Sequence, residues 1–148
     1  MNPPSNEMRK ILAKTVIKEH ADDYSIVFID PRYEGKARGL LRDLRPYSSV
    51  TYTEDEVSVV IRASDWDKLK GNFPFSREES PYRLITFDIV LDLSMVGFLS
   101  VVSTALAEVG VSVYALSTFL KDHILVRKGD SEKAIDVLRG LVSDAAAR

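Results

Sequence analysis

The second half of the chain carries the pattern that most constrains its fold. Its apolar residues alternate in three segments and recur at helical spacing in two others. The predicted elements are a strand at 84–92, a helix at 95–109, strands at 111–119 and 123–127, and a helix that begins at 130–131. This order of strand, helix, strand, strand and helix predicts a ferredoxin-like layer, with helices on one face of an antiparallel sheet.

The first half follows the same order with a weaker signal, after an additional amphipathic helix predicted at 7–20. The other predicted elements are a strand at 24–30, a short basic helix at 37–44, a hairpin of strands at 49–53 and 57–62, and a short helix capped by Ser64. The two halves share little literal sequence, so the repeat is one of pattern. We therefore expect an α+β protein of two ferredoxin-like (βαββαβ) halves that form a pseudo-dimer.

The expected domain boundaries follow from composition. Residues 1–6 are rich in Pro, Asn and Ser and are predicted to be a disordered lead-in. The N-terminal half with its extra helix is predicted at 7–72 and the C-terminal half at 82–148. Prolines and charges between them predict a linker at 73–81.

Composition excludes several classes of function. The chain of 148 residues has no cysteine, which excludes disulfides, thiol catalysis, thiolate zinc sites and iron–sulfur clusters. A net charge of −2 gives no electrostatic reason to expect nucleic acid or an anionic membrane as a partner. No apolar run approaches the roughly 18 residues of a membrane span, and the N-terminus lacks the apolar core of a signal peptide. We expect a cytoplasmic protein that binds neither nucleic acid nor membrane.

The sequence offers few candidate bases for catalysis, because the chain contains only two histidines. His20 is expected to be solvated at the end of the first helix. His123 follows Asp122 in a strand, and neighbouring strand residues point to opposite faces, which argues against a triad with Ser117. The acidic run 54–56 is predicted to be a solvated turn, and no Walker, calcium-loop or GxGxxG pattern occurs. We expect no enzyme, no cofactor and no metal, unless His123 and a carboxylate converge in one closed pocket.

The most suggestive stretch for binding a small molecule is residues 91–100. Ser94 is a natural N-cap, and the first turn of the helix after it would offer free N–H groups and a positive dipole end to a carboxylate. Gly97 lies within that predicted turn. It either leaves room for a ligand or lets the helix pack closely on the sheet, and the sequence favours neither use.

A free amino acid also carries an ammonium group, which Asp122 would match in charge. Asp122 also suits simple turn chemistry, so both uses stay open. Phe119 and Tyr114 either line such a site or belong to the core or an interface.

Three segments of the chain carry a resemblance to a known family. The first, residues 93–119 (LSMVGFLSVVSTALAEVGVSVYALSTF), resembles the opening of an ACT domain, a small βαββαβ module that binds amino acids and regulates metabolism. Residues 117–126 (STFLKDHILV) resemble the ST-x-x-x-D-[HY]-x-L-V signature of small tandem-ACT, CASTOR-like proteins of bacteria and archaea. Residues 49–61 (SVTYTEDEVSVVI) resemble the SVT-x-T-x-x-E-x-S-[IV]-V segment of the same proteins. The segments agree in order and spacing across residues 24–139.

The resemblance implies a ligand site at an interface between two domains, against the loop after the first strand. Carried over to this sequence, the ligand-binding residues are Asp92, Leu93, Ser94, Met95, Val96 and Gly97 on the loop and Ser117, Thr118, Phe119, Asp122 and His123 opposite it. The Asp-x-Pro-Gly run usual in ACT domains of metabolic enzymes is absent here.

The resemblance thus implies a non-catalytic regulatory or sensor protein with tandem ACT domains, which binds an amino acid and assembles as a homodimer. The alternative function is an oligomerisation or protein-interaction module that holds no ligand and regulates a partner enzyme. In that alternative, exposed strand edges would make the pairing.

Overall fold

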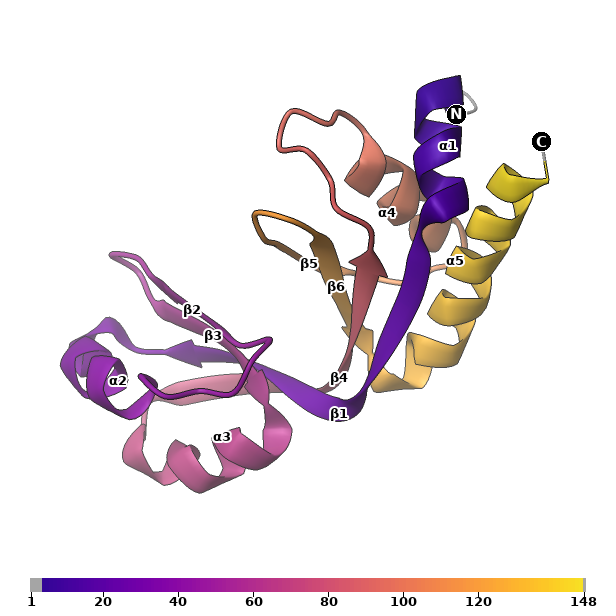
Figure 1. Ribbon diagram of the computed structural model, residues 1–148. Coiled ribbons are helices and arrows are strands. Elements are labelled where there is room, and N and C mark those ends of the chain that lie inside the picture. Colours follow the sequence, from indigo (N-terminus) through magenta and orange to yellow (C-terminus); the bar gives the residue numbers. More distant parts are fainter. Residues whose placement is uncertain (1–3, 148) are drawn as a thin grey trace. The chain divides into compact units, whose positions relative to one another are not determined.

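The computed structural model describes residues 4–147 and divides into two compact units (Figure 1). Unit 1 combines the chain up to Ala21 with the chain from Arg83 onward, and unit 2 comprises residues 22–82. Two long strands, β1 (Val16–Ile29) and β4 (Ser76–Asp88), each contribute residues to both units. Each unit is a mixed α/β structure that contains antiparallel strand pairs.

Unit 2 contains two short α-helices, two 3-10 helices (η) and a hairpin besides its parts of β1 and β4. The elements are η1 (Pro31–Tyr33), α2 (Glu34–Leu40), β2 (Ser49–Tyr52), β3 (Val57–Arg62), α3 (Ala63–Leu69) and η2 (Lys70–Asn72). The strand order is β2-β3-β1-β4, and β3 is antiparallel to both β1 and β2. Trp66 and Phe73 stack at 5.8 Å between ring centroids in a core that includes alternate residues of β3.

The predicted hairpin at 49–62 is confirmed, and a side chain fixes its turn. The Thr53 hydroxyl accepts hydrogen bonds from the backbone N–H groups of Asp55 (3.2 Å) and Glu56 (3.1 Å). The Thr53 backbone N–H donates to the Glu56 carbonyl at 2.9 Å. These bonds satisfy the backbone of the acidic turn while its carboxylates face solvent.

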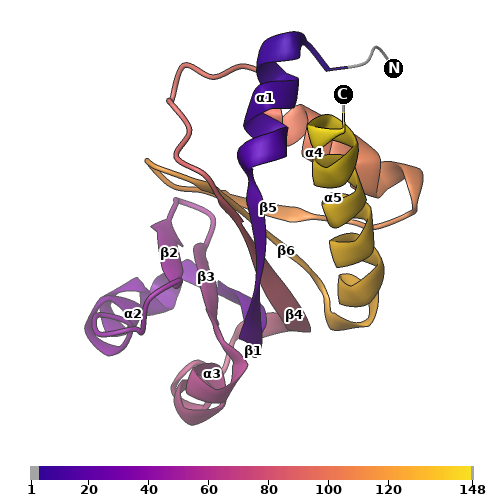
Figure 2. The same cartoon turned by 45° about the vertical axis from the view of Figure 1, so that its right-hand side comes forward.

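Unit 1 has three helices on one side of its strands (Figure 2). Its remaining elements are α1 (Asn6–Lys14), α4 (Phe98–Glu108), β5 (Tyr114–Ser117), β6 (Asp122–Arg127), η3 (Lys128–Asp130) and α5 (Ser131–Ala146). The strand order is β1-β4-β6-β5, and β5 is antiparallel to β6. Met8 and Leu12 of α1 enter the same buried cluster as residues of α4, α5, β4 and β6. The predicted final helix and the second strand of the 111–127 region are confirmed.

The first predicted helix is too long. α1 ends at Lys14 and β1 begins at Val16, so the predicted helix at 7–20 is wrong in its last six residues. Thr15, Val16 and Ile17 are β-branched and favour extended backbone. The Thr15 hydroxyl accordingly donates to the Ile11 carbonyl at 2.8 Å at the helix end. Of the predicted lead-in, residues 1–3 lie outside the described residues, and residue 6 already belongs to α1.

The predicted linker at 73–81 is a second correction, because most of it forms the start of β4. The prolines and charges of this segment correctly indicate exposure, since residues 77–81 are exposed. Its backbone is nevertheless extended as part of β4, and Ser80 bonds it to β1. The Ser80 hydroxyl donates to the Tyr24 carbonyl at 3.3 Å and accepts from the Ser25 hydroxyl at 3.0 Å. The structure therefore divides the chain within β1 and β4, and α1 belongs to unit 1.

Other predicted boundaries shift by a few residues. The basic helix predicted at 37–44 lies at Glu34–Leu40, the strand predicted at 84–92 ends at Asp88, and the strand predicted at 111–119 is Tyr114–Ser117. Among the described residues, no helix combines the length and apolar composition needed to cross a membrane.

The packing of α1 gives a direct test of the unit 1 core. Leu12 is 1% exposed, so Leu12→Ala should lower the free energy of unfolding by about 2–5 kcal/mol through lost burial and a residual cavity. Lys10→Ala, on the exposed side of the same helix, should change it by less than about 0.5 kcal/mol. Urea denaturation followed by circular dichroism measures both. Equal effects of the two substitutions would contradict the docking of α1.

Candidate functional site

The candidate site lies where the chain between β4 and α4 meets the turn between β5 and β6. The Leu91 N–H donates to the Leu120 carbonyl at 2.8 Å and joins the two segments. The Lys121 ammonium lies 2.6 Å from an Asp88 carboxylate oxygen and adds an ion pair next to this bond. That pairing lowers the pKa of Asp88 from its ordinary value. Both segments are therefore held against each other at one end of unit 1.

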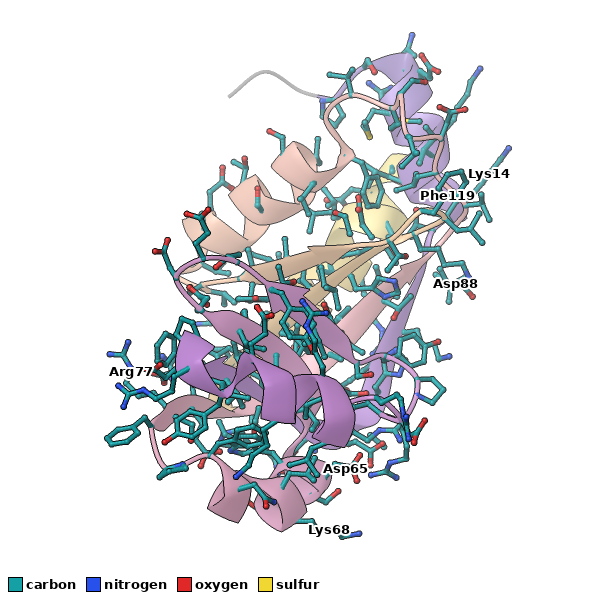
Figure 3. All side chains as sticks on the ribbon, turned by 90° about the vertical axis from the view of Figure 1, so that its left-hand side faces the viewer. Lys14, Asp65, Lys68, Arg77, Asp88 and Phe119 are labelled. Carbon is teal, nitrogen blue, oxygen red and sulfur yellow. The ribbon has the colours of Figure 1, made fainter. Side chains whose placement is uncertain are left out.

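A hollow of about 320 Å³ lies between these segments, and we call it the loop hollow. Its lining residues are Leu91, Asp92, Leu93, Met95, Gly97, Phe98, Leu99, Ser100, Ser117, Thr118, Phe119, Leu120, Lys121 and Asp122. Its volume is at the lower end of the range of small-molecule pockets. Phe119 is 74% exposed, and Figure 3 shows it pointing outward at the surface.

The structure brings together eight of the eleven predicted site residues around the loop hollow. They are Asp92, Leu93, Met95, Gly97, Ser117, Thr118, Phe119 and Asp122. Ser94 and Val96 line a second hollow of about 410 Å³ instead, which also includes Ser5, Glu7 and Met8 of the N-terminal region. His123 lines neither hollow and is 6% exposed.

The prediction that Ser94 caps the helix is wrong. The Ser94 hydroxyl and N–H both donate to the same Asp92 carboxylate oxygen, at 2.6 and 2.8 Å. These hydrogen bonds, first from the hydroxyl and then from the backbone, lower the pKa of Asp92 from its ordinary value. Helix α4 begins at Phe98 with Gly97 as its N-cap, at a φ of 97°. Glycine is required there because this left-handed conformation is costly for other residues.

The corrected helix start still opens into the loop hollow. Gly97, Phe98, Leu99 and Ser100 all line it, so the first turn of the 11-residue helix α4 forms part of its wall. N–H groups of a first helical turn have no partner within the helix and carry the positive end of its dipole. Leu99 and Ser100 were missed from the sequence because the helix was placed three residues too early.

Asp122 forms the opposite wall of the loop hollow. It is half-buried at the start of β6, and it accepts a hydrogen bond from the Ser117 hydroxyl at 2.8 Å. Lys121 and Leu120 beside it also line the hollow and were not predicted. The site thus sets a helix start, suited to a carboxylate, and an acidic side chain, suited to an ammonium group, around one space.

The histidines form no catalytic arrangement with Ser117 and Asp122. His123 bonds instead to Thr86 on β4 (2.9 Å from Nδ1) and to Thr118 (3.1 Å from Nε2). His20 was expected to be solvated on a helix, yet it is half-buried in β1, with Nε2 2.8 Å from the Thr86 hydroxyl. No pattern in the sequence had indicated that Thr86 would bond to both histidines. Over residues 4–147, no group of three or more histidine and carboxylate side chains is placed to hold a metal ion.

Comparison with known proteins agrees with this fold. Residues 78–140 match the model of the ACT domain family. No curated protein matches the chain. The protein Atu0741 from Agobacterium tumefaciens has a similar solved structure, at 25% identity and a TM-score of 0.70, covering 86% of this chain and 89% of that one.

Two further solved structures are similar at lower identity. VC0802 from Vibrio cholerae, a protein of unknown function described as a possible transport protein, is 19% identical, with a TM-score of 0.67 and coverage of 91% and 95%. The ligand-free regulatory subunit of aspartate kinase from Thermus thermophilus is 11% identical, with a TM-score of 0.64 and coverage of 86% and 97%. At these identities the similarity shows the fold alone.

Two glycine substitutions test the conformation at the start of α4. Gly97→Ala should lower the free energy of unfolding by about 1–2 kcal/mol, because alanine is strained at a φ of 97°. Gly140→Ala should raise it by about 0.5–1 kcal/mol, because Gly140 is a helical residue of α5 with open space around a new Cβ. Urea denaturation measures both. A stabilising Gly97→Ala would show that this position is an ordinary helical residue.

Proposed function

We propose that the protein is a non-catalytic regulatory protein that senses a free amino acid bound in the loop hollow. The observation that carries this proposal is the placement of the first turn of α4 and the Asp122 carboxylate around one space. The ACT domain match over residues 78–140 supports a regulatory, amino-acid-sensing role. The regulatory subunit among the similar structures supports the same role through its fold.

A zwitterion fits the two walls chemically. The ligand carboxylate would accept hydrogen bonds from the N–H groups of Phe98, Leu99 and Ser100 at the positive end of α4. The ammonium group would donate to Asp122, with Asp92 on the same rim. Leu91, Met95 and Phe119 would contact the ligand's side chain. Local dipoles and one carboxylate suffice for such a ligand, in keeping with the chain's net charge of −2.

We further propose that the units are two ACT-like, ferredoxin-like halves of one tandem protein. Unit 2 reads strand, helix, strand, strand, helix, strand from β1 to β4. Unit 1 gives the same order when counted from β4 to α5, with β1 supplying the last strand. The strand orders β2-β3-β1-β4 and β5-β6-β4-β1 then correspond position by position.

The second candidate function is an interaction module without a ligand, which assembles as a homodimer or binds a partner enzyme. Large apolar side chains on the loop and the turn favour it. Leu93, Val96 and Phe119 are 70%, 88% and 74% exposed, and exposed apolar groups of this kind mark interaction sites. The two functions are distinguished by measuring whether an added amino acid changes the stability of the protein.

The proposal is tested by measuring the melting temperature in the presence of each of the twenty amino acids. A ligand at 100 times its Kd adds about 2.7 kcal/mol of stability, which should raise the melting temperature by about 5–10 °C. Asp122→Asn keeps the oxygen that accepts from Ser117 but removes the charge. It should weaken the affinity for the stabilising amino acid about tenfold or more, because a hydrogen bond to a charged group contributes about 1.5–3 kcal/mol.

Asp136→Asn is the matched control, since Asp136 is exposed on α5 and lines neither hollow. It should leave the affinity unchanged. If no amino acid stabilises the protein at millimolar concentration, amino-acid sensing is wrong and the interaction module is favoured. Equal losses in the two variants would place the ligand away from Asp122.

A further inference from the structure

Half of the fourteen residues that line the loop hollow are large and apolar. The two lining residues that are fully buried, Leu91 and Phe98, are both of this kind, at 9% and 2% exposed. Phe98 is fixed in place by its edge-to-face contact with Phe87, at 5.5 Å between ring centroids. Met95 and Leu99 line the same hollow and are half-buried. The buried part of the lining is therefore apolar.

The exposed part of the lining also carries large apolar side chains. Leu93, Phe119 and Leu120 are 70%, 74% and 53% exposed, and Figure 3 shows Phe119 at the surface. They come from both segments, Leu93 from the chain before α4 and the other two from the turn between β5 and β6. Exposed apolar groups gathered around a hollow mark a binding site. An apolar ligand side chain would cover them and remove their surface from water.

The polar side chains of the lining are largely bonded to other groups of the protein. The Ser117 hydroxyl donates to Asp122 at 2.8 Å, and the Thr118 hydroxyl donates to the Lys121 carbonyl at 2.9 Å. Ser100 lies at the start of α4, where the ligand's carboxylate would bind. A polar ligand side chain would therefore lose hydrogen bonds to water without finding matching donors, which is unfavourable.

The charges of the lining disfavour an acidic ligand side chain. Asp92 and Asp122 contribute two carboxylates, whereas the one ammonium group, that of Lys121, already pairs with Asp88 at 2.6 Å. A basic side chain could approach Asp92, but Asp92 is exposed, and ion pairs at exposed positions contribute little. The same basic group would have to leave water among apolar side chains.

We propose that the loop hollow selects amino acids with a large, uncharged, apolar side chain, such as leucine, methionine or phenylalanine, and that Leu93 and Phe119 determine this selectivity. The selectivity rests on the proposed function, because the start of α4 and Asp122 would hold the groups that all amino acids share. The ligand's side chain would then extend along the apolar lining and be covered by Leu93 and Phe119 from the two rims.

Matched ligands test this selectivity by separating the shape of the ligand from its chemistry. Leucine, asparagine and aspartate have branched side chains of nearly the same shape, and norleucine lacks only the terminal ammonium group of lysine. Isothermal titration calorimetry of the full-length protein should give a Kd for leucine about tenfold or more below those of asparagine and aspartate. Norleucine should bind about tenfold or more tightly than lysine. Alanine should bind more weakly than leucine by about fourfold for each carbon that the hollow buries.

Two substitutions test the residues that determine the selectivity. Leu93→Ala and Phe119→Ala should each raise the Kd for leucine about fivefold, because each removes apolar surface that the ligand covers. They should leave the Kd for alanine within about twofold, since alanine does not reach these side chains. Val90→Ala is the matched control, because Val90 is 64% exposed on the same segment and lines neither hollow. All three side chains are exposed, so the variants should fold like the wild type.

The outcomes distinguish the selectivity from the proposed function. If no amino acid binds, both are wrong. If aspartate or asparagine binds as tightly as leucine, or lysine as tightly as norleucine, amino-acid sensing stands and the apolar selectivity is overturned. Equal losses of leucine affinity in Leu93→Ala, Phe119→Ala and Val90→Ala would show that Leu93 and Phe119 do not determine it.

Discussion

The hydrogen bond from the Leu91 N–H to the Leu120 carbonyl joins the two segments on which the candidate site depends. Without it, the chain between β4 and α4 and the turn between β5 and β6 would be separate surface loops. The Lys121–Asp88 ion pair reinforces the junction on one side. Below it, Phe98 packs edge-to-face on Phe87 at 5.5 Å and fixes the start of α4 on the core. Buried packing thus positions a site whose own residues are mostly exposed or half-buried.

The elements of unit 1 could be predicted because their burial is periodic. Along β4 and β6, alternate residues enter one core, and α5 presents one apolar stripe to it. The start of α4 could not be predicted from local preferences. Ser94 is a favoured N-cap residue, but Asp92 takes both its hydroxyl and its N–H, and the helix begins only after Gly97. Eight of the eleven residues predicted for the site nevertheless line the loop hollow, since an error of three residues stays within one loop.

The hydrogen bonds between interior polar groups could not be predicted from the sequence, for a different reason. His20 was assigned to a helix because the apolar spacing of α1 continues weakly past Lys14, whereas strand pairing determines the structure from Val16 onward. Its partner Thr86 lies 66 residues away in the chain. No pattern in a single sequence pairs two such residues, although this pair links β1 to the strand that leads into the site.

The central claim is that one amino acid occupies the loop hollow, and mapping of chemical shifts tests it most directly. Backbone amide spectra of the full chain should be recorded with and without an equimolar mixture of the twenty amino acids. We predict shifts concentrated in residues 91–100 and 117–122, the two segments that contain all the lining residues of the hollow. Unchanged spectra, or shifts confined to residues 22–82 of unit 2, would contradict the account.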